Sequence, residues 1–177
     1  MIIQMKFITS IIVFLPAATL LVGAEASNPM MDSSKAFYNQ IKNNIQRSLE
    51  KMPEEQYAFK PSPDVRSFGQ LVAHVADAQY ILCGIVADGK PTMKTNEKTA
   101  KTKAELSAAL KDGFAFCDAQ YEKLTDADAA TTVNWFGQKR TKLSVLDFNI
   151  AHAFEHYGNM VTYMRMKGLV PPSSEKQ

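Results

Sequence analysis

Two histidines near the C-terminal end of the chain, His152 and His156, stand four residues apart in a segment whose apolar pattern predicts a helix. Because successive residues of an α-helix turn by about 100°, the two rings lie about 40° apart on one face. Two imidazoles at this spacing can reach one metal ion. The chain has three histidines, and the third, His74, lies on the inward face of another predicted helix. We therefore expect His74, His152 and His156 to bind a divalent metal.

Three neutral imidazoles leave a fourth coordination position open, which is typical of catalytic zinc sites and not of closed structural ones. Imidazole also suits nickel, copper and iron, and we expect zinc or nickel. Two other interpretations stay open: a bundle that holds a metal or ligand without catalysis, and histidines that only fill a polar core. A haem site is disfavoured, because two histidines on one helix face cannot ligate opposite sides of one iron.

Other polar side chains lie close to this histidine face. Asn149, Asn159 and Tyr163 project within about 60° of it. We expect Asn149 and Asn159 to orient the imidazoles through their second nitrogen or to bind substrate. Tyr163 and Glu155 are the candidate catalytic groups, with Glu155 as a base for bound water, although it points about 60–100° away from the histidines.

The segment from His152 to His156 also matches H-x-x-E-H, the inverted zinc-protease pattern. That pattern needs a further carboxylate ligand well downstream in a large domain. Glu175 is the only acid after His156 and lies in a polar tail, which argues against a protease. The chain also has no G-x-S-x-G motif, phosphate-binding glycine loop or dinucleotide fingerprint.

The elements that must position these residues are four predicted helices. They cover about 33–52, 68–87, 102–124 and 144–167, from the spacing of their apolar residues. Ser67 with Gln70 and Thr102 with Glu105 have the pattern of capping boxes, and Gly168 is the expected left-handed stop of the last helix. The segment 125–141 fits either a short hairpin or an irregular loop. We expect an all-α fold, a four-helix bundle with long connecting loops.

The N-terminal residues read as a cleavable signal peptide. Lys6 precedes a largely apolar run from Phe7 to Val22, and a small-x-small cleavage pattern ends at Ala26. A retained membrane anchor is disfavoured, because the run is shorter than the about 20 residues of a spanning helix and contains Pro16. We expect a signal peptide at 1–26, a single folded domain at 27–177, a periplasmic or secreted location and no membrane association after cleavage.

Composition and charge narrow the function classes further. The chain has 46% hydrophobic residues and 20 Lys and Arg against 18 Asp and Glu, as in an ordinary globular protein. The basic residues are scattered without interleaved aromatics, so we expect no nucleic-acid partner. Cys83 and Cys117 could form a disulfide in an oxidising compartment or be buried free thiols. The apolar stripe around Cys117 argues against a thiolate nucleophile.

Two motifs make the chain resemble the DinB-like superfamily. They are Arg66–Val75, which contains His74, and the C-terminal run from His152 to Asn159 that continues through Tyr163 to Pro171 and Pro172. The resemblance implies a four-helix bundle, often dimeric, with a divalent metal held by His74, His152 and His156. The family commonly has Gln at the position of Asn159. Relatives include S-transferases and isomerases that use low-molecular-weight thiols. An exported protein would meet little of these reduced thiols.

These observations together predict an exported, divalent-metal-binding protein with a three-histidine site. The expected activity is that of a metal-dependent hydrolase or thiol S-transferase acting on a small molecule, and the resemblance implies a homodimer. The alternative is a non-catalytic helical bundle that binds a metal or another ligand.

Overall fold

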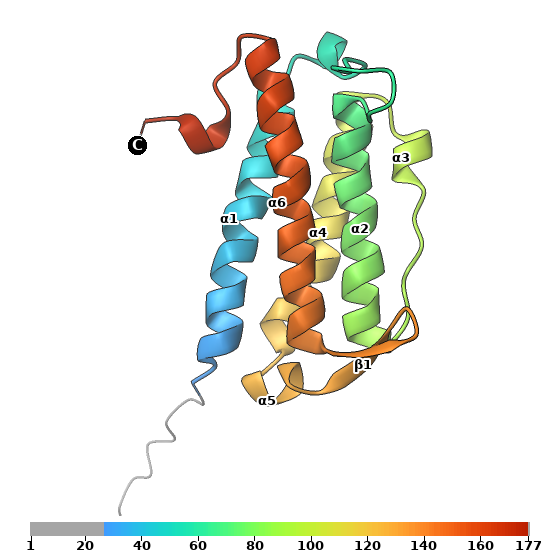
Figure 1. Ribbon diagram of the computed structural model, residues 1–177, viewed down its shortest axis with the longest axis vertical. Coiled ribbons are helices and arrows are strands. Elements are labelled where there is room, and N and C mark those ends of the chain that lie inside the picture. The colour runs from blue at the N-terminus through green and yellow to red at the C-terminus, as the bar shows by residue number, and fades with distance from the viewer. Residues whose placement is uncertain (1–26, 177) are drawn as a thin grey trace, which may run out of the picture.

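Four long helices form the bundle seen in the computed structural model, which describes residues 27–176 (Figure 1). They are α1 (Pro29–Lys51), α2 (Phe68–Asp88), α4 (Lys103–Lys123) and α6 (Lys142–Met166). The connections hold short helices, 3-10 turns and one hairpin: α3 (Asn96–Thr99), α5 (Asp126–Ala129), η1 (Glu54–Gln56), η2 (Pro172–Ser174), β1 (Thr132–Trp135) and β2 (Gln138–Thr141). The expected four-helix bundle is confirmed. The predicted signal peptide lies outside the described residues.

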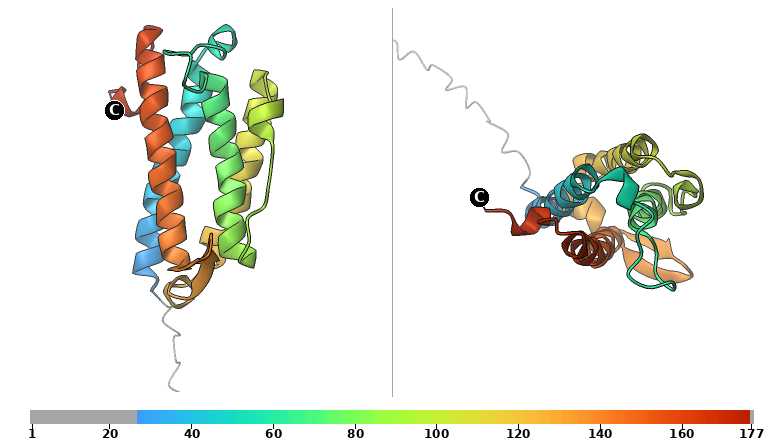
Figure 2. Two further views of the ribbon diagram at one scale, coloured as in Figure 1. Left: turned by 45° about the vertical axis from the view of Figure 1, so that its right-hand side comes forward. Right: turned by 90° about the horizontal axis from the view of Figure 1, so that it is seen from above.

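The direction of the helices explains the long connections. In Figure 1, α1 and α6 run upward while α2 and α4 both run downward. The link 89–102 must therefore return along the bundle before α4 begins. A helix as long as α2 spans about 30 Å at about 1.5 Å per residue, and extended chain covers about 3.3 Å per residue, so such a link needs on the order of ten residues. On its way the link carries α3 past α2 (Figures 1 and 2).

The two capping boxes predicted from the sequence are present. Ser67 accepts a hydrogen bond from the Gln70 backbone, and the Gln70 side chain accepts one from the Ser67 backbone. Thr102 and Glu105 make the same pair at the start of α4. Each box satisfies two of the backbone N–H groups that a helix start leaves unpaired.

Two helix starts differ from the prediction. The first helix begins at Pro29, four residues early, because a proline fits the first turn, where no backbone N–H is needed. The last helix begins at Lys142, because the side chain of Thr141 caps it by accepting from the Ser144 backbone. Gly168 has a φ of 74°, which confirms it as the left-handed stop of α6.

The segment that the sequence left ambiguous contains a hairpin. Strands β1 and β2 pair antiparallel, from Thr132 opposite Thr141 to Trp135 opposite Gln138. The two turn residues between them, Phe136 and Gly137, have φ of 45° and 90°. Positive φ at both central positions is the geometry of the turn that matches the twist of a two-residue hairpin.

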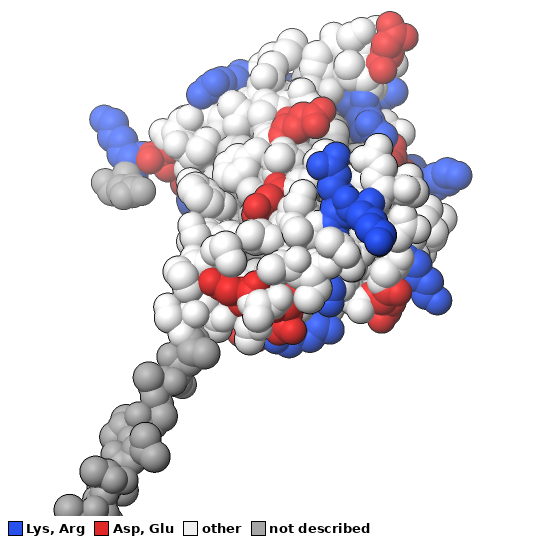
Figure 3. Space-filling model, turned by 60° about the horizontal axis from the view of Figure 1, so that its bottom comes forward, with Lys and Arg blue, Asp and Glu red and all other residues white. Residues whose placement is uncertain are grey.

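Helix α2 is buried on nearly all sides. By length and composition it could cross a membrane, but 72% of the apolar window is buried among the described residues. Its apolar character therefore fits its place in the core. At one end of the bundle, shown in Figure 3, acidic and basic groups both occur, separated by larger areas of uncharged surface.

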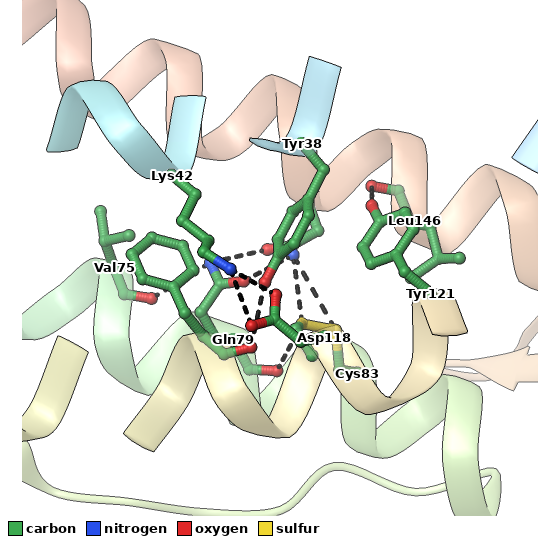
Figure 4. Close-up of a disulfide and its surroundings, with 11 residues drawn as sticks. Tyr38, Lys42, Val75, Gln79, Cys83, Asp118, Tyr121 and Leu146 are labelled. Atoms are coloured by element: carbon green, nitrogen blue, oxygen red, sulfur yellow. Dashed lines mark hydrogen bonds and ion pairs between the residues drawn. A yellow bond between two sulfur atoms is a disulfide. The ribbon is translucent and has the colours of Figure 1, made fainter. Parts of the chain in front are cut away.

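Helix α2 packs most closely against α4. A disulfide joins Cys83 of α2 to Cys117 of α4, with their Cα atoms 5.3 Å apart (Figure 4). Further along the same pair, a Cβ on Gly113 would lie 2.8 Å from the carbonyl oxygen of Ala76. The glycine therefore allows a close approach of two backbones that a larger residue would prevent.

The variants Gly113→Ala and Gly158→Ala test this close approach. Alanine normally stabilises a helix interior by about 0.5–1 kcal/mol relative to glycine, and at Gly158 a Cβ meets nothing within 4 Å. We expect Gly158→Ala to raise the free energy of unfolding in urea by about that amount. Gly113→Ala should lower it by about 1–3 kcal/mol, because α2 and α4 must move apart. Stabilisation by both variants would contradict the tight contact.

Candidate metal centre

The three histidines meet on adjacent faces of α2 and α6. His74 comes from α2, and its Nε2 lies 3.3 Å from Nε2 of His152 on α6. Nε2 of His156, one turn further along α6, lies 3.0 Å from that of His152. The ligand nitrogens of the three residues all lie within 4.8 Å of one another. Tetrahedral zinc with Zn–N bonds of about 2.0–2.1 Å places its ligand nitrogens about 3.3 Å apart, so the cluster fits one divalent ion.

The protonation of these rings also suits metal binding. Burial, followed by the proximity of His156, His74 and Arg66, lowers the pKa of His152 to about 4. Burial is also the main cause that lowers the pKa of His156, and His74 and Arg66 add to it. Both imidazoles are therefore neutral at physiological pH, and a neutral imidazole carries the lone pair that a metal needs.

Glu97 on α3 holds His74 from the side opposite to the cluster. Nδ1 of His74 lies 2.9 Å from Oε2 of Glu97, which makes Nδ1 the donor and leaves the Nε2 lone pair facing the other histidines. A carboxylate in this position is the usual support of a metal-binding histidine. Burial would raise the pKa of Glu97, but hydrogen bonds from Arg66 and His74 outweigh it and lower the pKa.

Asp77, one turn after His74 on α2, fixes the helix that carries Glu97. Its Oδ1 accepts hydrogen bonds from the backbone and side chain of Asn96, at 3.1 and 2.8 Å, and its Oδ2 accepts from the Glu97 backbone at 3.0 Å. The carboxylate therefore binds the first backbone donors of α3. Sequence reasoning missed Glu97. The available signal was Asp77, an acid three residues after a histidine on an otherwise apolar helix.

The two asparagines do not hold the imidazoles as expected. Asn149 is buried and exchanges two hydrogen bonds with Gln79 of α2, at 2.8 and 3.2 Å. Its role is thus to join α2 to α6, and the prediction that it orients a histidine is corrected. Asn159 is exposed, on the rim of a surface hollow. Within residues 27–176, the buried Nδ1 atoms of His152 and His156 have no hydrogen-bond partner.

A hollow of about 530 Å³ opens beside the histidines. Its wall includes His156, together with charged and polar side chains: Lys60, Asp64, Arg66, Gln70, Glu97, Glu155, Asn159 and Tyr163. The cluster is thus next to a space that a small molecule could enter. A larger hollow, of about 610 Å³ between α1 and α6, contains none of the three histidines.

The candidate catalytic residues Glu155 and Tyr163 both line this hollow. Glu155 is exposed and lies on α6 directly before His156. Tyr163 is buried, and its hydroxyl donates a 2.8 Å hydrogen bond to the Arg66 carbonyl. Burial raises the pKa of Tyr163, so its phenol stays neutral and anchors the residue that precedes the α2 cap. A positioning role therefore fits the geometry of Tyr163 better than a catalytic one.

Aromatic side chains border the cluster on its other side. The ring of Phe148 stacks on His152 with centroids 6.2 Å apart, and Trp135 from β1 packs edge-on against Phe148 at 4.9 Å. Phe148 is half-exposed. Phe148 of α6 thus lies beside the ring of His152, and the hairpin packs on Phe148 through Trp135, a contact that sequence spacing could not reveal.

Comparisons with known proteins agree with this architecture. The sequence model of the DinB superfamily matches residues 38–160. The uncharacterised protein YjoA of Bacillus subtilis (strain 168) is 25% identical over 122 residues, which cover 67% of this chain and 79% of that protein.

Two solved structures share the fold at lower sequence identity. A DinB-like protein from Bacillus cereus ATCC 10987 is similar at a TM-score of 0.69 and 21% identity, covering 80% of this chain and 95% of that one. The DinB-like protein YjoA from Bacillus subtilis is similar at a TM-score of 0.66 and 21% identity, covering 82% and 99%.

The Glu97 contact gives a direct prediction. We expect Glu97→Ala to weaken zinc binding about 10–100-fold, because His74 loses the partner that fixes its tautomer and ring orientation. Isothermal titration of zinc into the metal-free protein measures this. Glu122→Ala, which removes an exposed carboxylate paired with Lys35, is the matched control and should bind like the wild type. Equal affinities of all three proteins would show that Glu97 does not support the site.

Proposed function

The chain belongs to the DinB superfamily, and we propose that it is an exported metal-dependent enzyme that acts on a small molecule. In this proposal His74, His152 and His156 hold one divalent ion, zinc or nickel, and leave one coordination position to water or substrate. The reaction is of the hydrolase or thiol S-transferase type.

The observation that carries the proposal is the convergence of three Nε2 atoms beside an open hollow. Two facing imidazole nitrogens can share a single proton, but three that meet at one point cannot all be paired in this way. Nε2 of His152 lies within 3.3 Å of both other rings. One cation at the common point would satisfy all three lone pairs at once.

A divalent ion at this point would supply Lewis acidity, which lowers the pKa of a bound water or thiol. The residues of the chain supply the rest. Glu97 holds the tautomer of His74, and Glu155 lies at the rim of the hollow, where a carboxylate can take a proton from a bound nucleophile. Phe148 stacks on His152 and is itself packed against Trp135, so this side of the ring faces apolar groups.

The alternative is a bundle that binds a metal without catalysis, and it would fit a cluster sealed from solvent. Two observations favour the enzyme. His156 lines the 530 Å³ hollow, and His74 and His152 are only partly buried. Tyr157 does not cover the cluster, because its hydroxyl binds Ser173 beyond the end of α6. A small molecule therefore has a path to the proposed ion.

Export rests on two features of the chain. The first is the predicted signal peptide at 1–26. The second is the disulfide between Cys83 and Cys117, both of them fully buried, because such bonds form and persist mainly in oxidising compartments. A buried structural disulfide between α2 and α4 thus supports a protein that matures outside the cytoplasm.

Metal analysis of protein purified without a polyhistidine tag tests the proposed centre. We expect about one equivalent of zinc or nickel per chain by inductively coupled plasma mass spectrometry, since three imidazoles at these distances complete most of a tetrahedral site. His74→Ala and His156→Ala should each reduce it to near zero, while Asn43→Ala, which changes an exposed residue of α1, should not. Metal content near zero in the wild type, or unchanged in both histidine variants, would overturn the metal centre.

Intact-mass analysis of the protein purified from its native host tests export. We expect a chain that begins at Ser27, because the cleavage pattern ends at Ala26. Alkylation should label no cysteine before reduction and both Cys83 and Cys117 after reduction under denaturing conditions. A full-length chain with two free thiols would contradict export.

A further inference from the structure

We propose that Arg66 forms an anion-binding subsite beside the metal centre and selects substrates that carry a carboxylate. This inference rests on the proposed metal function and specifies its substrate class. Arg66 lies on the wall of the hollow that His156 also lines. No sequence motif for carboxylate recognition marks this arginine.

Arg66 is held in place at both its backbone and its side chain. Its carbonyl accepts the hydrogen bond from Tyr163 of α6 at 2.8 Å. It directly precedes Ser67, whose backbone conformation is fixed by the capping box of α2. On the side chain, Nε donates to Oε1 of Glu97 at 2.8 Å. An arginine anchored in this way loses little further freedom when it binds a ligand.

The remaining donors of the guanidinium are free to bind a ligand. In the Arg66 side chain, Nε is bound to Glu97. The two Nη groups have no hydrogen-bond partner within residues 27–176. The side chain is 41% exposed. A guanidinium presents its Nη donors as a planar fork that matches the two oxygens of a carboxylate. The free end of Arg66 therefore offers the donors that a substrate carboxylate needs.

The charges around the hollow favour an anion with a single negative charge. Lys60 is exposed on the same wall and has no ion pair in residues 27–176. The carboxylate of Glu97 already contacts both Arg66 and His74. A divalent ion would make the hollow positive overall. Asp64 and Glu155, also on the wall, would repel a phosphate dianion more strongly than a carboxylate.

Arg66 lies close to the cluster, because one carboxylate joins it to His74. Oε1 of Glu97 accepts from Nε of Arg66 at 2.8 Å, and Oε2 of Glu97 lies 2.9 Å from Nδ1 of His74. A ligand that binds the metal through one donor atom could therefore reach Arg66 with a carboxylate carried on the same small molecule. The proposed substrate class is a small carboxylate with a second, metal-binding group.

Two small ligands that differ in a carboxylate test the subsite. Imidazole-4-acetate and 4-methylimidazole both bind a metal through a ring nitrogen, and only the first can also reach Arg66. Each is titrated into cobalt-loaded protein, and the visible spectrum of cobalt reports binding. The quantity compared is the ratio of the two affinities, which cancels any change in metal content. The carboxylate of imidazole-4-acetate can also bind the metal, and this contribution is the same in every variant. The effect of Arg66 is therefore the change of the affinity ratio between the wild type and an Arg66 variant.

We expect Arg66→Gln to reduce the ratio about tenfold, the effect of losing a charge-assisted pair of hydrogen bonds. Arg66→Lys keeps the positive charge but removes the paired Nη donors, so it should reduce the ratio less than Arg66→Gln does. If Arg66→Gln does not fold, Arg66→Lys tests the role of the guanidinium in its place. Arg165→Gln is the matched control, because Arg165 is exposed and binds Ser174 near the C-terminus. It should leave the ratio unchanged.

The outcomes separate this proposal from the function on which it rests. A ratio that is the same in the wild type and in the folded Arg66 variants would overturn the anion subsite and leave the metal centre standing. Failure of the wild type to bind cobalt would overturn the metal centre and the subsite together. An equal fall of the ratio in Arg165→Gln would also overturn the subsite, because it would show a general effect of net charge.

Discussion

The structure around the site depends on one constraint: three imidazole nitrogens must meet within a few ångströms although they come from two helices. The spacing of His152 and His156 is set within α6 by the helix itself. The position of His74 depends on how α2 lies against α6. With Nε2 atoms 3.0 and 3.3 Å apart, a small sliding of either helix would remove one ligand from the common point. The other polar contacts of the core can be understood from this requirement.

Several contacts hold α2 at that position. The buried amides of Gln79 and Asn149 exchange two hydrogen bonds and join α2 to α6. The same Asn149 amide lies 3.5 Å from Sγ of Cys117, so the disulfide to α4 belongs to this buried polar layer. Asp77 ties α3 to α2 and thereby brings Glu97 to His74. Buried polar groups with satisfied partners favour one register over others, which is what a metal site between two helices needs.

The sequence predicted the four helices, both capping boxes and the pair His152 and His156, because each rests on local spacing that helix geometry converts directly into structure. It predicted His74 from the inward face of its own helix and from the family resemblance. It could not predict Glu97. That residue lies in a long connection, and its place follows from the direction of α2 and α4, which sends the link back along the bundle. Asn149 was misassigned for a related reason. Its angle on α6 was correctly placed near the histidine face, but its partner Gln79 belongs to another helix, and only the packing of the two helices identifies it.

The proposal for Arg66 extends the same logic from the histidines to their surroundings, since Glu97 contacts both His74 and the guanidinium of Arg66. The central claim is still that the three rings bind one ion. X-ray absorption at the metal edge of the zinc- or nickel-loaded protein tests it most directly. The account predicts three imidazole ligands, at about 2.0–2.1 Å for zinc, with one further light atom. A shell of oxygen or sulfur ligands without imidazole scattering would contradict it.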